Sequence, residues 1–160
     1  MTREKSNVTL SNKNLSNEDK GSYVLLIKLP EEQTITVGRL KVLHFLRGYY
    51  AYVGSALGGF KVRLNRHLKQ DKKPHWHIDY LLQQASITSI ILCQTQQRIE
   101  CAIAQALGHQ FDSIPGFGSG DCRCHSHLFF AAEEMERKIM NTLNSLDMKP
   151  KLRTNLSFTA

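Results

Sequence analysis

Apolar and polar positions follow strand-like patterns in the first half of the chain. The run SYVLLIKL at residues 22–29 is almost continuously apolar, as expected of a central strand that is buried on both faces. Three further segments have β-forming patterns, at residues 34–37, 42–45 and 49–53. Gly38 and Arg39 between the first two predict a hairpin turn. Together these segments predict a three- or four-stranded antiparallel meander.

Helical spacing dominates the second half. Helices are predicted at residues 61–68, 76–84, 98–107 and 131–147, and strands at residues 87–93 and 127–130. In the third helix Ile99, Ile103 and Leu107 recur at the spacing of one buried face. The last helix carries Met135, Ile139, Leu143 and Leu146 on one stripe, which predicts that it docks on the core.

The ends of the chain differ from the middle. Residues 1–20 are polar and lack periodicity, which predicts a disordered tail. Residues 131–160 are expected to form the C-terminal helix and a frayed tail that begins near residue 148, so the main domain covers residues 21–130. The predicted fold class is α/β of the α+β kind, with a small antiparallel sheet flanked by helices.

Composition narrows the functional classes. The chain has 160 residues, 41% hydrophobic and 22% charged, as in a globular protein of one domain. No apolar run reaches the roughly 18 residues that span a bilayer, and the N-terminus has no secretory signal. We therefore expect a cytoplasmic protein, in which four cysteines do not indicate a disulfide scaffold. The net charge of +7 either favours a polyanion, with nucleic acid the first choice, or serves solubility alone.

Several side chains could carry chemistry. Arg63 and His67 are four residues apart, so they share a helix face that offers a phosphate-binding fork and a proton carrier. The alternative is a solvated basic face. Glu100 borders an apolar stripe, where it could pair with an arginine, bind Mg²⁺, or simply face solvent in the first turn of a helix. Tyr50 and Tyr52 share one strand face, either as core aromatics or as reactive phenols.

The segment DCRCHSH at residues 121–127 contains four potential zinc ligands: Cys122, Cys124, His125 and His127. In an extended chain the two cysteines point to one side and the two histidines to the other, which argues against one tetrahedral site. Zinc would therefore need help from elsewhere, for example from Cys93, Cys101 or the histidines of residues 75–77. The other interpretation is a structured loop next to the cleft.

The order of these residues resembles that of a known nuclease family. The triplets Gly21-Ser22-Tyr23 and Tyr52-Val53-Gly54, a glycine-rich loop, Arg63 and His67 on a helix, and a later helical Glu100 resemble the motifs of the GIY-YIG nucleases. The resemblance covers residues 21–110. It extends to about residue 130 in a bacterial and archaeal subgroup of Uri type, DUF123-like, which shares the blocks GYYxYVGSAxG, HWHIDYLL and PGFGSxDCxCxSHLF.

The resemblance implies a metal-dependent DNA endonuclease with a three-stranded core sheet into which the hairpin is inserted. Its expected role is repair or processing of single-stranded or branched DNA. The resemblance also implies that Tyr23 or Tyr52 activates the attacking water, that Arg63 holds the scissile phosphate, that Glu100 binds Mg²⁺ or Mn²⁺, and that His67 lies near the nucleophile. A tyrosine is a poor base near neutral pH unless a cation such as Arg63 lowers its pKa. Further substrate-binding residues are implied at Gly54, Ser55, Arg66, His75 and His77.

Two departures keep alternatives open. The first triplet reads GSY, and no asparagine lies between Glu100 and Asn141, where many family members have one after the glutamate helix. The chain could thus be a nucleic-acid-binding module of the same fold with little catalysis, or a scaffold that needs a protein partner for targeting. Trp76, between His75 and His77, either stacks on a base or packs in the core.

Overall fold

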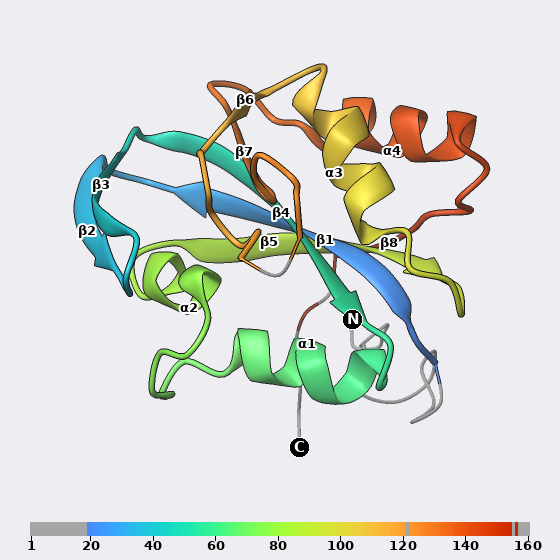
Figure 1. The fold of residues 1–160 in the computed structure, drawn as a ribbon, viewed down its shortest axis with the longest axis horizontal. Coiled ribbons are helices and arrows are strands. Elements are labelled where there is room, and N and C mark those ends of the chain that lie inside the picture. The colour runs from blue at the N-terminus through green and yellow to red at the C-terminus, as the bar shows by residue number, and fades with distance from the viewer. Residues whose placement is uncertain (1–18, 121, 155, 157–160) are drawn as a thin grey trace, which may run out of the picture.

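The computed structural model describes residues 19–120, 122–154 and 156, and arranges them as a six-stranded sheet with helices on both faces, next to a two-stranded hairpin (Figure 1). The sheet is antiparallel, and its strands are, in spatial order, β6 (Asp112–Ser113), β7 (Leu128–Ala131), β4 (Gly48–Ala56), β1 (Gly21–Leu29), β5 (Ser86–Gln94) and β8 (Lys151–Arg153). The helices are α1 (Phe60–Leu68), α2 (His77–Leu82), α3 (Glu100–Gly108) and α4 (Glu136–Ser145). The predicted α+β class is confirmed. Of the predicted disordered tail at residues 1–20, residues 1–18 lie outside the described residues, whereas the carbonyls of Asp19 and Lys20 accept backbone hydrogen bonds from Phe60 and Thr95.

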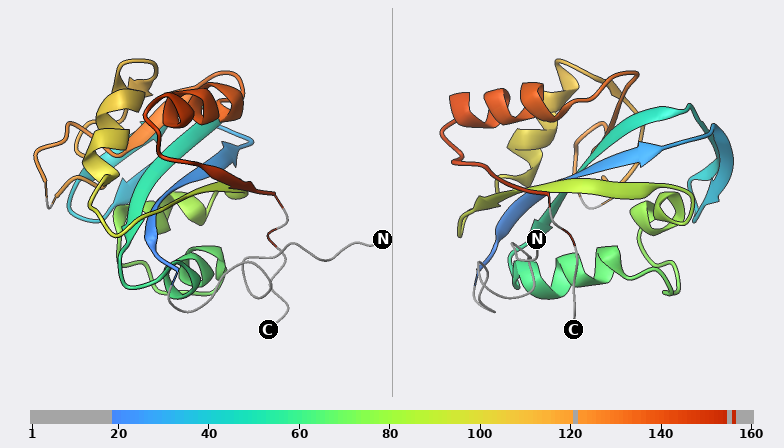
Figure 2. Two further views of the ribbon diagram at one scale, coloured as in Figure 1. Left: turned by 90° about the vertical axis from the view of Figure 1, so that its right-hand side faces the viewer. Right: turned by 180° about the vertical axis from the view of Figure 1, so that it is seen from behind.

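Strand β1 is the centre of the sheet and is buried on both faces, as its apolar run predicts. Its alternate residues Tyr23, Leu25 and Ile27 enter a core that is covered by α1 and α2. Val24 and Leu26 point to the opposite core, which α3 and α4 cover. Figure 2 shows these two helix pairs on opposite sides of the sheet. Period-two alternation in one strand therefore separates two hydrophobic cores.

The predicted hairpin is present, but the predicted meander is wrong. Strands β2 (Gln33–Val37) and β3 (Lys41–Phe45) pair only with each other and form a separate two-stranded sheet. Both edges of β1 are already occupied by the nine-residue strands β4 and β5, so no edge remains for the hairpin. The hairpin is thus an insertion that buries Val37 and Phe45 against the α1 and α2 side.

The C-terminal part departs from the expectation of fraying. Residues 151–153 form β8, which pairs with Ile90–Leu92 of β5. The apolar Leu152 packs against the core below α3 and α4, so burial stabilises a strand that is too short to give a pattern in the sequence. Helix α4 buries Ile139 and Leu143 as predicted, whereas Leu146 is 44% exposed because the helix ends one residue before it. None of the helices in the described ranges is long and apolar enough to cross a membrane.

The Tyr23 ring fits between β1 and β4 because Gly54, which lies opposite it, has no side chain. Tyr23 lies opposite Gly54, and a Cβ atom added there would come within 2.4 Å of the Tyr23 ring and hydroxyl. Tyr23 is fully buried, so its ring cannot move into solvent. Overpacking of this kind costs about 1–3 kcal/mol or more.

We therefore expect Gly54→Ala to lower the free energy of unfolding by about 2 kcal/mol or more in urea titrations. Gly58→Ala is the matched control, because a Cβ atom there would meet no heavy atom within 4 Å. That variant should stay within about 0.5 kcal/mol of the unmodified protein. Equal effects of the two substitutions would show that the ring contact does not constrain position 54.

Candidate functional site

A cleft of about 480 Å³ opens where β4, α1, α2 and α3 come together. It is lined by Tyr52, Gly54, Ser55, Leu57, Gly58, Arg63, His75, Trp76, His77, Arg98, Glu100, Gly118 and Gly120. The lining combines two arginines, one carboxylate, two imidazoles and a phenol with glycines that allow close approach to the backbone. The end of β4 and the first turns of three helices thus bring distant parts of the chain to one recess.

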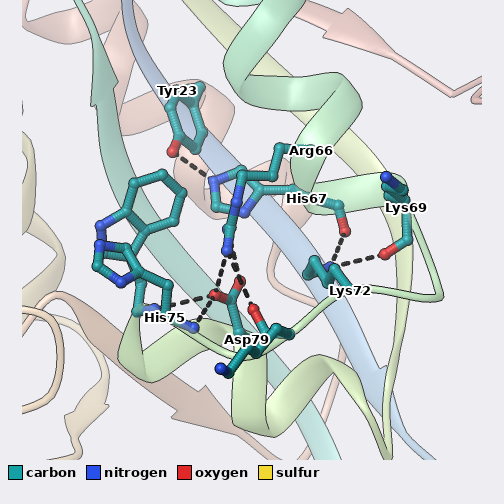
Figure 3. Close-up of polar contacts among 9 residues, drawn as sticks. Tyr23, Arg66, His67, Lys69, Lys72, His75 and Asp79 are labelled. Atoms are coloured by element: carbon teal, nitrogen blue, oxygen red, sulfur yellow. Dashed lines mark hydrogen bonds and ion pairs between the residues drawn. The ribbon is translucent and has the colours of Figure 1, made fainter.

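Tyr23 and His67 form a buried pair beneath this cleft. The Tyr23 hydroxyl lies 2.6 Å from His67 Nε2, and both side chains are almost completely buried. Burial, followed by the neighbouring phenol of Tyr52, raises the pKa of Tyr23 well above its ordinary value, while Arg63 opposes this shift. Burial also lowers the pKa of His67 to about 3. At neutral pH the pair is therefore a neutral phenol hydrogen-bonded to a neutral imidazole (Figure 3).

Arg63 extends from α1 into the cleft and is held from two directions. Its Nη1 donates to the carbonyl oxygen of Ser55 at 3.1 Å, and its charge lowers the pKa of the nearby Tyr23 phenol. Its guanidinium carbon lies 4.4 Å from the centre of the Trp76 ring, within the range of a cation–π contact. No carboxylate within the described ranges forms an ion pair with Arg63. The guanidinium is therefore fixed in place with its charge available to an anion.

Arg66 is held differently, although it is only three residues from Arg63. Its two terminal nitrogens donate to the two carboxylate oxygens of Asp79 at 3.0 and 2.9 Å, a bidentate pair. Asp79 is 1% exposed and also accepts from the backbone N–H groups of His75 and Trp76, which caps the start of α2 (Figure 3). Burial alone would raise the pKa of Asp79, but these hydrogen bonds lower it. Arg66 consequently stabilises the wall of the cleft and does not line it.

The phenol of Tyr52 lines the cleft, and the residue is 9% exposed. Gly118, with φ of 71°, passes so close that an added Cβ atom would lie 3.0 Å from the Tyr52 ring. The Gly118 backbone N–H donates to His77 Nδ1 at 2.9 Å, which fixes this loop to α2. Burial, then the charge of Glu100, raises the pKa of Tyr52. We expected Arg63 to lower the tyrosine pKa, but burial outweighs it.

Glu100 begins α3 at the opposite side of the recess and is 25% exposed. Its Oε2 lies 2.9 Å from Nδ1 of His127, a buried residue just before β7. Burial lowers the pKa of His127, but the Glu100 carboxylate and the Cys122 thiol raise it overall above its ordinary value. The second carboxylate oxygen of Glu100 has no hydrogen-bond partner among the described residues.

The structure brings together most of the sequence-predicted site residues. Tyr52, Gly54, Ser55, Arg63, His75, His77 and Glu100 line one cleft, whereas Tyr23 and His67 lie directly beneath it and Arg66 is paired with Asp79. Sequence reasoning missed Asp79, although a carboxylate three residues into the helix that follows Pro74 is a recognisable capping position. It also missed Gly118, because nothing local indicates that this glycine packs on Tyr52.

The segment 121–127 also differs from its expected geometry. The described residues from Cys122 onward bend and are not extended, so the alternation argument against shared ligation does not apply. Cys122, Cys124 and His127 meet Cys101 of α3, and their ligand atoms lie within 4.8 Å of one another. His125 is exposed and Cys93 lies in the core, so neither joins this cluster. The four residues are a possible metal-binding cluster.

Comparison with known proteins gives one result. The model of the family described as domain of unknown function DUF123 matches residues 22–148, which is most of the chain. No curated protein and no solved structure gives a significant match.

The low pKa of His67 predicts a loss of stability in acid. The unfolded chain binds a proton at His67 below about pH 6.5, whereas the folded protein does so only near pH 3. Stability is therefore fully present above pH 6.5 and falls as the pH drops towards 3. We expect the free energy of unfolding, measured in urea, to fall between pH 7 and pH 4 in the unmodified protein. In His67→Gln this fall should be smaller by on the order of 3 kcal/mol. If the free energy of unfolding changed with pH in the same way in both proteins, that result would contradict a buried neutral imidazole at His67.

Proposed function

Because the chain belongs to the DUF123 family, a GIY-YIG-like group, we propose that its cleft hydrolyses phosphodiester bonds of DNA with the help of a divalent metal ion. The observation that carries the proposal is the convergence of Tyr52, Arg63 and Glu100 on one recess from β4, α1 and α3. Hydrolysis of a phosphodiester needs a group that positions water, a cation for the phosphate charge and a carboxylate for a metal ion. The recess offers all three.

Arg63 is the proposed phosphate-binding residue. Its guanidinium is held by Ser55 and Trp76, so little side-chain freedom is lost when an anion binds. A fixed donor whose charge has no carboxylate partner among the described residues stabilises the charge that grows on the phosphate oxygens in the transition state. Arg98 lines the same recess and adds a second, exposed cation.

Glu100 is the proposed ligand for Mg²⁺ or Mn²⁺. A partly exposed carboxylate with one uncommitted oxygen fits these ions, which retain several waters and need only one or two protein carboxylates. When bound, such an ion would polarise the phosphate and help the leaving oxygen depart. His127 holds the other carboxylate oxygen, so the protein itself sets the direction of the free one.

Tyr52 is the proposed contact for the attacking water, because its phenol is the one that lines the recess. Its raised pKa means that it stays a neutral hydroxyl, which orients the water by a hydrogen bond and does not take its proton; that proton leaves to solvent or to a phosphate oxygen. Tyr23 and His67 act behind it as positioning residues: His67 holds the Tyr23 phenol beneath the recess, near the charge of Arg63.

The proposed substrate is single-stranded or branched DNA. Tyr52, Arg63 and Glu100 line a recess in the surface, so the scissile phosphate must leave the regular path of a duplex to reach them. A strand without a paired partner does this at lower cost in stacking and pairing energy. The net charge of +7 supports a polyanionic partner.

The direct test is cleavage of labelled single-stranded, duplex and branched DNA with Mg²⁺ or Mn²⁺. We expect Arg63→Ala and Glu100→Gln each to reduce the single-turnover rate by about 10²-fold or more, because each removes a group that acts on the phosphate charge. Arg47→Ala is the charge-matched control, since Arg47 is exposed and lies outside the cleft. Excess EDTA should stop cleavage, and added Mg²⁺ should restore it.

Cleavage that survives both cleft substitutions would overturn the proposal. Binding that falls steeply with salt, without cleavage of any substrate, would instead assign the chain to the class of nucleic-acid-binding modules. Retention of full activity in Arg47→Ala is needed to exclude a general effect of reduced positive charge.

A further inference from the structure

Three cysteines and one histidine converge beside the cleft, and the nuclease proposal uses none of them as a ligand. Cys101 is in the first turn of α3, Cys122 and Cys124 are in the loop before β7, and His127 immediately precedes that strand. Their four ligand atoms all lie within 4.8 Å of one another.

The distances fit a tetrahedral site. With zinc–sulfur bonds of about 2.3 Å and a zinc–nitrogen bond of about 2.0–2.1 Å, ligand atoms in a tetrahedron lie roughly 3.5–3.8 Å apart. Cys122 Sγ and His127 Nε2 are already 3.4 Å apart. The remaining pairs need to close by about 1 Å at most, and Cys122 and Cys124 are in a loop that can accommodate this.

The position of His127 is set by backbone contacts that need no metal. Its N–H donates to the Phe117 carbonyl at 2.8 Å, and its carbonyl accepts from Val53 of β4 at 2.9 Å. The ring therefore stays between two partners, with Nε2 facing Cys122 and Nδ1 at 2.9 Å from Glu100 Oε2. One nitrogen faces the cysteines while the other lies 2.9 Å from a carboxylate oxygen, and a metal-bound histidine commonly has a carboxylate beside its second nitrogen.

We propose that Cys101, Cys122, Cys124 and His127 bind one structural Zn²⁺ ion, and that this ion orients Glu100 through the His127 ring. Four protein ligands leave no open position for water or substrate, which is typical of structural and not of catalytic zinc. Three thiolates and an imidazole suit zinc, whereas Mg²⁺ requires oxygen ligands. The site is thus separate from the metal ion proposed at the free oxygen of Glu100.

The ion would connect the loop before β7 to the start of α3. That loop also carries Gly118, which packs on Tyr52 and bonds to His77. Zinc at Nε2 keeps the His127 proton on Nδ1, where it points to Glu100. The zinc site itself does not rest on the nuclease proposal; only its effect on the activity does.

The test measures metal on the full chain without DNA. Protein purified without chelators should contain about one equivalent of zinc per chain by elemental analysis. Replacement by Co²⁺ should give the visible absorption of a tetrahedral ion and the near-ultraviolet charge-transfer band of cobalt–thiolate bonds. This spectrum needs only the unmodified protein, so it remains informative if a variant fails to fold.

Cys101→Ser and Cys124→Ser should each reduce zinc affinity by roughly tenfold or more, measured by competition with a chromophoric chelator. Cys93→Ala is the matched control, because Cys93 is a buried cysteine of β5 outside the cluster. It should keep the full zinc content.

Four results would overturn the proposal: no zinc together with no cobalt spectrum, unchanged affinity in both serine variants, a disulfide between two of the cluster cysteines in the protein as purified, or another ion bound in place of zinc by the same four residues. An active nuclease without zinc would leave the proposed function intact and remove this site. A chain that binds zinc but does not cut DNA would leave the zinc site intact and contradict the proposed function.

Discussion

The pairing of β1 with β4, in the register that places Tyr23 opposite Gly54, is the constraint on which the rest of the site depends. A one-residue shift would turn one strand over relative to the other, so that Tyr23 and Tyr52 would lie on opposite faces of the sheet. In the observed register the Tyr23 ring fills the space above Gly54, its hydroxyl lies 2.6 Å from His67 Nε2, and it connects the centre of the sheet to the helix that lines the cleft. Local packing of one ring thus positions a charged side chain in the cleft.

Two neighbouring arginines differ in their partners, and this difference leaves one positive charge in the cleft available to an anion. Arg66 forms an ion pair with buried Asp79, and Asp79 caps the start of α2. Arg63 has only neutral contacts among the described residues, including the Trp76 ring that both guanidinium groups share at 4.4 and 4.2 Å. The same aromatic ring therefore links a structural ion pair to a guanidinium whose charge remains available. Trp76 is engaged by arginine and is not a free platform for a base.

Much of the fold and of the site could be predicted from the sequence, for identifiable reasons. The continuous apolar run of β1 and the helical spacing of Ile103 and Leu107 reflect burial, which the chain must encode locally. The ordered set of Tyr23, Tyr52, Arg63 and Glu100 carried the family resemblance, and the family match confirms that assignment. Strand β8 and the meeting of Cys101 with Cys124 could not be predicted, because both depend on tertiary contacts between segments with weak local patterns. The tyrosine pKa direction was wrong because the sequence shows the neighbouring cation but not the depth of burial.

The central claim is that Arg63 and Glu100 act on one phosphate as parts of a single site. The most direct measurement is the single-turnover cleavage rate of Arg63→Ala, Glu100→Gln and the double variant on the same DNA. Groups that act as a unit give strongly non-additive losses, so the double variant should be about as slow as the slower single variant. If the rate loss of the double variant equalled the product of the two single losses, the two side chains would act independently, and this would contradict the account.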